Sequence, residues 1–321
     1  MPYLVGVDEA GYGPNLGPLI ISATAWWTDK EPAECDLYSQ LRAAVVSRTI
    51  REVDDPRIAI ADSKKLYKSG GGVAELEYGV LSALAACRQK VRVWRDVWES
   101  LAGATGAHLQ AVPWYENYSI DLPVDAELPV LAQRSDNFQS VTDRTGARLV
   151  AMKSVAVFPR QFNELVSQFD SKGAALTRLT LELLSDIFEH TAAEPTLVVC
   201  DKHGGRNRYA DQLQEHFPEY LIEIYGESRP QSVYRWGPSA QRVEIRFQSR
   251  GESFLPAALA SMTSKYLREL AMMALNDFWR LQISDLRATA GYPADAKRFK
   301  SEIKDVQAAL QIDDELLWRC R

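Results

Sequence analysis

The chain has 321 residues, which is enough for one large domain or two domains of ordinary size. Its 46% hydrophobic and 25% charged residues are typical of a globular protein with a proper core. The formal charge of −6 argues against a protein that coats nucleic acid nonspecifically, but it permits an enzyme with a local basic groove. No stretch resembles a membrane span or a signal peptide. Four widely spaced cysteines without a C-x-x-C pair predict reduced thiols in a cytoplasmic protein.

The opening stretch, residues 3–18, combines a strand with an acidic, glycine-rich turn. Apolar, strand-favouring residues run directly into Asp8 and Glu9, and glycines and prolines follow up to Pro18. Such a backbone cannot continue a regular element, but it can approach a ligand closely and offer N–H groups to an anion. Alone, the same pattern is also typical of a strand end followed by a solvated turn.

Residues 19–26 predict a second strand, antiparallel to the first. The leucine and valine spacing predicts a helix over 37–47, and we expect a further helix over 73–88 and a strand over 90–94. Between these two helices, the string DSKKL places Lys64 and Lys65 in a loop that could meet phosphates. On its own, that string is better explained as a solvated charged turn before a helix.

Residues 98–147 have poor periodicity and several prolines, and we interpret them as an insertion into the core fold. The insertion carries Trp114, Tyr115 and Tyr118. These aromatic residues could stack on bases, although packing of an irregular segment on the main body is the commoner role and the favoured interpretation.

A strand over 149–158 and two helices, over 160–169 and 174–190, precede a short apolar strand that ends at Asp201. Ligands of α/β sheets bind outside the carboxyl ends of strands, so we expect Asp8 and Asp201 to meet there. His203 could assist a proton transfer beside them, but a loop histidine is more often a bystander.

The last third predicts three strands and three helices. The strands are expected over 220–225, 233–236 and 242–247, and a helix over 208–216 precedes them. Glu252 lies just before a long apolar helix over 254–280, where an acid can simply be a cap. A GYP turn at Tyr292 leads into a final helix that ends near residue 310, within a C-terminal helical segment over 281–321.

Five strings, in order, resemble the type 2 ribonuclease H family: DEAG, DSKKL, the strand ending at Asp201, GES before the long helix, and GYP. The FQSRGES string is most similar to ribonuclease HIII. The resemblance implies a ribonuclease H-like α/β fold, a mixed central sheet flanked by helices in one domain over residues 1–321. The chain departs from the family pattern at Tyr12, where arginine is usual, and at Lys202, where glycine is usual.

The resemblance implies that Asp8, Glu9, Asp201 and Glu252 are catalytic and bind metal. Four oxygen ligands suit Mg²⁺ or Mn²⁺, and two such ions could activate a water and stabilise the leaving oxygen of a phosphodiester. The resemblance also implies a set of substrate-binding residues: Gly11, Tyr12, Gly13, Lys64, Lys65, Ser261, Lys265 and Tyr292.

We therefore expect a metal-dependent endoribonuclease that cuts the RNA strand of RNA–DNA hybrids and leaves 5′-phosphate and 3′-hydroxyl ends. A ribonucleotide-containing duplex is a second possible substrate. Three alternatives remain: a nuclease with another substrate, a catalytically silent nucleic-acid-binding protein on the same fold, and an α/β protein whose acids are only caps and strand ends.

Overall fold

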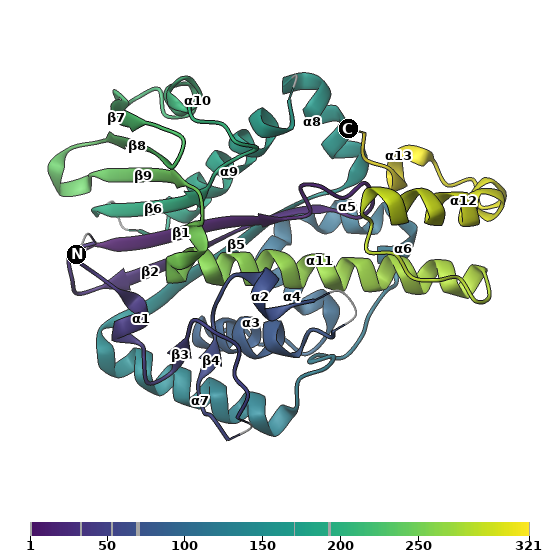
Figure 1. Cartoon of the computed structure of the whole chain (residues 1–321), viewed down its shortest axis with the longest axis horizontal. Coiled ribbons are helices and arrows are strands. Elements are labelled where there is room, and N and C mark those ends of the chain that lie inside the picture. The colour runs from purple at the N-terminus through teal and green to yellow at the C-terminus, as the bar shows by residue number, and fades with distance from the viewer. Residues whose placement is uncertain are drawn as a thin grey trace.

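The computed structural model describes residues 2–32, 34–52, 54–68, 71–169, 171–191 and 194–320. Within the last range, the backbone of Glu252 is described but its side chain is not. A seven-stranded mixed sheet lies at the centre, in the order β5-β2-β1-β6-β9-β8-β7 (Figure 1). The strands are β1 (Tyr3–Ala10), β2 (Leu19–Thr28), β5 (Ala147–Val157), β6 (Thr196–Asp201), β7 (Glu223–Glu227), β8 (Gln231–Trp236) and β9 (Val243–Gln248).

The directions of these strands place the carboxyl ends of three of them at one edge. β1, β6 and β9 are parallel neighbours, whereas β2 and β5 extend the sheet on one side as an antiparallel meander and β8 and β7 extend it on the other. This architecture confirms the predicted mixed sheet flanked by helices.

Two apolar layers cover the sheet, because side chains alternate between its faces along each strand. On β1, Leu4 belongs to one core cluster, and Val5 and Val7 belong to the other. The first face carries α3 (Ala74–Ala86), α4 (Trp94–Ala102), α7 (Leu128–Thr145) and α11 (Leu255–Gln282); the second carries α8 (Pro159–Phe169), α9 (Lys172–Phe188) and α10 (Ala210–His216).

The long helix α11 packs directly on β1 and β2, and it runs alongside β1 in Figure 1. Its first turns touch the backbone of Gly6, where an added Cβ would lie 1.9 Å from the backbone nitrogen of Ala257. Thr24 on β2 donates a hydrogen bond to the carbonyl of Pro256 at 2.8 Å. The glycine therefore allows this helix to lie close enough to β1 to face the acidic strand end.

Two short elements differ from the predictions over 37–47 and 90–94. The expected helix over 37–47 is only α1 (Leu37–Gln40), because Val45–Val46 instead forms β3 and pairs with β4 (Ile58–Ala59). The expected strand over 90–94 is wrong as well. The Asp96 carboxylate accepts the backbone N–H groups of Arg92 and Val93, so that α4 begins at Trp94.

The segment 98–147 is mostly helical and supplies part of the main core. Short helices, α5 (Gly106–Gln110) and α6 (Pro113–Glu116), hide its periodicity in the sequence, and α7 completes it. Trp114 and Tyr115 are buried, and Tyr118 packs half-buried on the same cluster. The base-stacking role is therefore wrong for Trp114 and Tyr115, and the packing role is confirmed.

The C-terminal part consists of α12 (Pro293–Ala309) and α13 (Asp314–Leu317). The short α2 (Ser63–Leu66) carries the DSKKL string, and three short 3₁₀ turns are Gly103–Thr105, Ser239–Gln241 and Gly251–Ser253. All four cysteines are free thiols, as predicted. No helix in the described ranges is long and apolar enough to cross a membrane.

Candidate active site

The acidic residues Asp8 and Asp201 lie at neighbouring strand ends. In the parallel ladder Val7 is the partner of Cys200, so the next residues along the two strands are these two aspartates. Glu9 follows Asp8 on β1, and its backbone N–H donates to the Asp8 carboxylate at 2.9 Å. The strand-end pattern of the sequence thus correctly indicated that Asp8 and Asp201 would meet.

Burial among like charges makes these carboxylates difficult to ionise. Asp8 is only partly exposed, and burial, reinforced by Asp201, raises its pKa to about 7, although a hydrogen bond with Ser261 acts in the opposite direction. Burial, together with Asp8 and Asp201, also raises the pKa of Glu9 well above its ordinary value. A bound cation would lower these pKa values, because nearby positive charge favours the ionised carboxylates.

The fourth predicted acid, Glu252, has a side chain outside the described part of the structure. Its backbone belongs to the 3₁₀ turn Gly251–Ser253 that follows β9. A Cβ added at Gly251 would lie 3.4 Å from the backbone nitrogen of Asp201, so this turn lies directly beside the end of β6. The backbone is placed as the prediction requires, and the role of the side chain stays a prediction.

Lys64 is the cation that faces the acids. The Asp62 carboxylate caps α2 by accepting the N–H of Lys64 at 3.0 Å, which places this side chain beside the end of β1. Burial alone would lower the pKa of Lys64, but the neighbouring carboxylates, chiefly Asp62 and Asp8, outweigh it and raise the pKa. Both lysines are exposed, but Lys65 lies outside the cavity lining described next.

A cavity of about 430 Å³ opens next to the acids. Several residues predicted to bind substrate line it, although they come from four separate segments: Gly11, Tyr12, Gly13, Lys64, Lys265 and Tyr292, together with the acid Glu9. The remaining lining residues, which the sequence did not single out, are Ala10, Pro14, Ser63, Tyr67, Arg268, Glu269 and Ala290.

Lys265 is already paired within this cavity. Its ammonium group forms an ion pair with Glu269, one turn further along α11, and lies 4.3 Å from the centre of the Tyr67 ring. The Tyr67 hydroxyl donates to the same carboxylate at 2.7 Å. The spacing of four residues between Lys265 and Glu269 is a signal that could have predicted this pair from the sequence.

Ser261 is buried behind the acids and does not line the cavity. It hydrogen-bonds to Ser63 at 3.1 Å and to the Asp8 carboxylate. Ser264, one turn further along α11, donates to the backbone carbonyl of Asp8 at 3.0 Å. Ser261 and Ser264 thus hold the end of β1 against α11, whereas the sequence predicted that Ser261 would contact the substrate.

Tyr12 joins the glycine-rich loop to the loop that follows Asp201. The Tyr12 hydroxyl lies against Gly204, where an added Cβ would be 2.8 Å from the hydroxyl oxygen, and Gly204 has a positive φ of +60°. Burial, together with the Glu9 carboxylate, raises the pKa of the Tyr12 hydroxyl, and Arg206 acts in the opposite direction. The two loops therefore touch through a neutral phenol.

Lys202 and His203 are structural residues of that second loop. The Lys202 ammonium donates to Asn207 at 2.7 Å and to the carbonyl of Ser228 at 2.8 Å, and so ties the loop to β8 and the turn before it. His203 is buried, its Nδ1 lies 2.9 Å from the Thr177 hydroxyl, and burial lowers its pKa to about 3. A neutral, enclosed ring supports the bystander interpretation.

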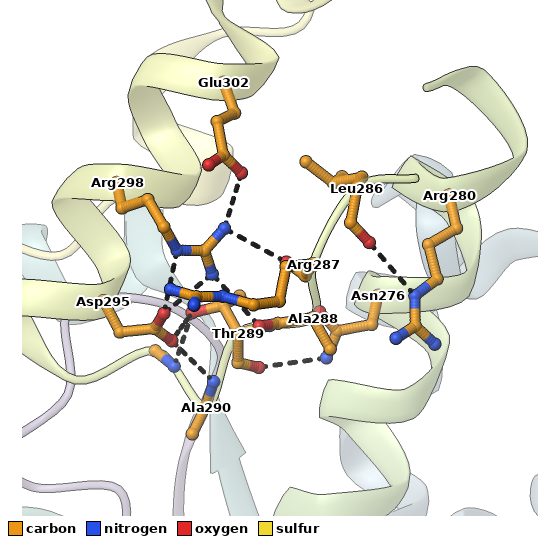
Figure 2. A network of polar contacts seen from close by, with 11 residues as sticks. Asn276, Arg280, Leu286, Arg287, Ala288, Thr289, Ala290, Asp295, Arg298 and Glu302 are labelled. Carbon is orange, nitrogen blue, oxygen red and sulfur yellow. Dashed lines mark hydrogen bonds and ion pairs between the residues drawn. The ribbon is translucent and has the colours of Figure 1, made fainter. Parts of the chain in front are cut away.

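The turn that carries Tyr292 is held by a network of polar contacts (Figure 2). The Asp295 carboxylate accepts from the Thr289 hydroxyl at 2.6 Å and from the backbone N–H of Ala290 at 3.1 Å. Arg298 donates to Asp295 at 2.7 Å and to the carbonyl of Ala288 at 3.0 Å. These bonds fix residues 288–291, so that Tyr292 projects at the cavity rim with 54% of its surface exposed.

The donor set of the acidic group fits a hard divalent cation only in part. Asp8, Glu9 and Asp201 offer oxygen ligands, and burial raises the pKa values of Asp8 and Glu9. Within the described residues, however, no three His, Cys, Asp or Glu side chains are already arranged around one metal position. Asp8, Glu9 and Asp201 bring their oxygen atoms to one edge of the sheet, and the backbone of Gly251–Ser253 lies beside Asp201.

Comparisons with known proteins give matches among solved structures alone: no family model and no curated protein matches the sequence. A chain from the PCNA–RNase HII complex of Archaeoglobus fulgidus is 14% identical, with a TM-score of 0.42 over 99% of this chain and 94% of that chain. Ribonuclease H2 from Pyrococcus horikoshii OT3 is 14% identical, with a TM-score of 0.44 over 98% and 92%.

A third similar structure is Bst-RNase HIII in complex with Mn²⁺. It is 13% identical, with a TM-score of 0.38 over 99% of this chain and 66% of that chain. Because all of these identities and TM-scores are low, function must be judged from the residues of the site.

Proposed function

We propose that the chain is a metal-dependent endoribonuclease of the type 2 ribonuclease H kind, a divergent relative in which residues 1–321 form one domain and 98–147 an insertion. The observation that carries this proposal is the convergence of Asp8, Glu9 and Asp201 beside a cavity lined by a glycine-rich turn and Lys64. The proposed substrate is the RNA strand of an RNA–DNA hybrid or a ribonucleotide-containing duplex.

Asp8, Glu9, Asp201 and Glu252 would hold Mg²⁺ or Mn²⁺, in two sites. When bound, such ions supply an activated water and neutralise charge on the leaving 3′-oxygen, so that 5′-phosphate and 3′-hydroxyl ends result. The protein residues orient the substrate. Lys64 attracts a backbone phosphate, and Lys65 contributes only long-range attraction from its exposed position.

The glycine-rich turn is the part of the cavity suited to reading a ribose. Gly11 has a positive φ of +94°, and a Cβ there would lie 2.5 Å from the carbonyl of Pro18. Gly13 is exposed and faces open space, so its backbone can approach a sugar closely. A contact to the 2′-hydroxyl is what distinguishes RNA from DNA at one position, and Tyr292 would pack on the neighbouring sugar.

One observation favours a second candidate, a nuclease of the same class with a different substrate preference. Tyr12 presents a phenol where the related motif has a guanidinium, and this phenol is engaged with the loop at Gly204. The cavity therefore has less positive charge at this turn than the motif implies. A ribonucleotide–deoxyribonucleotide junction could for that reason be read differently.

The test is cleavage of labelled duplexes in Mg²⁺ and then Mn²⁺ by the chain and by Asp201→Asn. An RNA–DNA hybrid, a DNA duplex with one ribonucleotide and an all-DNA duplex serve as substrates. Hybrid cleavage that the variant loses is the expected result. Cleavage of the all-DNA duplex at the same rate would establish the second candidate, and no cleavage of any duplex with either metal would overturn the nuclease proposal.

A further inference from the structure

Two buried arginines hold the glycine-rich loop from behind. Arg268 on α11 donates to the carbonyls of Pro18 at 2.8 Å, Leu16 at 3.2 Å and Ala290 at 3.1 Å. Arg319, near the C-terminus, donates through Nη2 to the carbonyl of Pro14. Each of the two arginine residues is at most 2% exposed. The loop wall of the cavity thus rests on two guanidinium groups.

The residues around Arg319 are joined to the same loop by backbone contacts. The N–H of Arg319 donates to the carbonyl of Asn15 at 2.8 Å, and the Asn15 side chain donates back to the carbonyl of Arg319 at 3.0 Å. Trp318 forms an antiparallel bridge with Leu16. We refer to residues 318–320 as the C-terminal clamp.

The clamp is also fastened on its other side, to α8. Asn163 donates to the carbonyl of Trp318 at 2.9 Å and accepts from the N–H of Cys320 at 2.7 Å. Figure 1 shows the C-terminus beside α8, far along the chain from the loop that it touches. The loop is therefore connected through three residues to a helix of the second face.

Burial of the charged Arg319 side chain at this position is energetically unfavourable. Within the described part of the chain Arg319 has no carboxylate in ion-pair distance, and its Nε and Nη1 have no hydrogen-bond partner. Its charge lies 4.9 Å from the centre of the Phe162 ring, and it is repelled by Arg268. An apolar side chain of similar volume is often at least as stable as a buried charge. The hydrogen bond from Arg319 to the carbonyl of Pro14 is thus the feature of this residue that an apolar side chain could not replace.

We propose that the C-terminal clamp positions the glycine-rich loop for substrate, with Arg319 as a positioning residue that fixes the cavity wall at Gly11–Gly13. This inference rests on the proposed function for its kinetic consequence. Its structural consequence, an ordered loop, is independent of any activity. A loop fixed in advance binds substrate without an ordering cost, so the clamp acts on KM more than on kcat.

The test compares Arg319→Met with a matched control, Arg134→Met. Arg134 on α7 is also buried, donates to a backbone carbonyl (Asp55, 3.2 Å), has an unpartnered Nη1 and lies 4.4 Å from the Tyr78 ring centre, but it is not part of the cavity. The measurements are the melting temperature, hydrogen–deuterium exchange at the amides of Asn15 and Leu16, and steady-state hybrid cleavage.

For Arg319→Met we expect an unchanged or higher melting temperature, loop exchange about tenfold faster, and a KM about tenfold higher with kcat within about threefold of the parent. Arg134→Met should leave the exchange of the loop and KM unchanged. Arg319→Lys, which can still donate to Pro14, should restore KM in part, and it replaces the methionine variant if that variant does not fold.

If the loop amides of Arg319→Met exchange as slowly as those of the parent, the proposal that the clamp orders the loop is overturned. Faster exchange with an unchanged KM would overturn its positioning role, and so would an equal loss of activity in Arg134→Met. If the parent protein cleaves no duplex, the proposed function fails by that result, whereas the exchange data still decide whether the clamp orders the loop.

Discussion

Val7 on β1 and Cys200 on β6 are partners in a parallel ladder, and the residue that follows each of them is an aspartate. The parallel pairing of β1 and β6 ends at this pair of residues and therefore brings two carboxylates together without any contribution from the loops. Burial at this strand edge, reinforced by Asp201, raises the pKa of Asp8 to about 7.

Removal of the Asp8 carboxylate should stabilise the metal-free protein. We expect Asp8→Asn to raise the free energy of unfolding at pH 7.5 by about 1–3 kcal/mol, because a raised carboxyl pKa means that the ionised form is disfavoured in the folded state. The sign follows from proton uptake: between about pH 4 and 7 folded Asp8 holds a proton that the unfolded chain lacks, so its contribution to stability falls as the pH rises. Urea unfolding in chelator at pH 5 and 7.5 measures this.

Mn²⁺ provides the control for this prediction. An ion held by Asp8, Glu9 and Asp201 stabilises only the folded protein, so it should raise the melting temperature of the parent at pH 7.5. Asp8→Asn should lose most of that increase. A metal-free variant that is less stable than the parent at pH 7.5 would contradict the electrostatic account.

The two lysines of DSKKL should behave differently. Lys64 lines the cavity and faces the acids, whereas Lys65 is exposed outside it. Lys64→Met should weaken hybrid binding by about tenfold and reduce the slope of log K against log salt by about one. Lys65→Met, the matched control, should change binding less than threefold. Fluorescence anisotropy over a salt series gives both values, and equal effects would refute the assignment.

Glu269 should limit the affinity of the cavity for polyanions. It neutralises Lys265 at the cavity wall, so Glu269→Gln should free the ammonium group and tighten hybrid binding by about threefold to tenfold at low salt. Glu182→Gln breaks a similar pair, with Arg178 on α9 at 2.8 Å, away from the cavity, and serves as control. Weaker binding by Glu269→Gln would mean that Glu269 orients Lys265 usefully.

Asp295 should be needed for the turn that carries Tyr292. Asp295→Ala removes acceptors for Thr289, Ala290 and Arg298 and should cost about 1–3 kcal/mol of unfolding free energy. Hydrogen bonds hold the pKa of Asp295 below its usual value despite burial, so this contribution is complete near neutral pH and is lost as the pH falls below about 4. Denaturant unfolding of parent and variant should therefore show a larger difference at pH 7 than at pH 3.

Local sequence patterns were sufficient for the seven strands of the central sheet and for the meeting of Asp8 with Asp201. A strand end is a local feature, and parallel neighbours share one edge. The apolar spacing over 37–47 wrongly predicted one long helix. Only Leu37–Gln40 is helical, because Val45–Val46 pairs with Ile58–Ala59 as a strand. The pattern also failed where helices of four or five residues left too few turns to show a period.

The supports of the candidate site could not be predicted from the sequence. Arg268 and Arg319 bind backbone carbonyls, and carbonyl partners leave no signature in side-chain chemistry. Ser261 has the right motif position but lies behind Asp8, which only packing reveals. Glu269 is the exception, because its spacing from Lys265 was readable in advance.

The bond between Asn15 and Arg319 also has a consequence for the order in which the protein is made. It joins positions separated by 304 residues. During synthesis Asn15 leaves the ribosome long before Arg319 is added. A nascent chain can thus gather much of its hydrophobic core while this loop wall is still unfastened, and the wall is completed only after Arg319 has emerged.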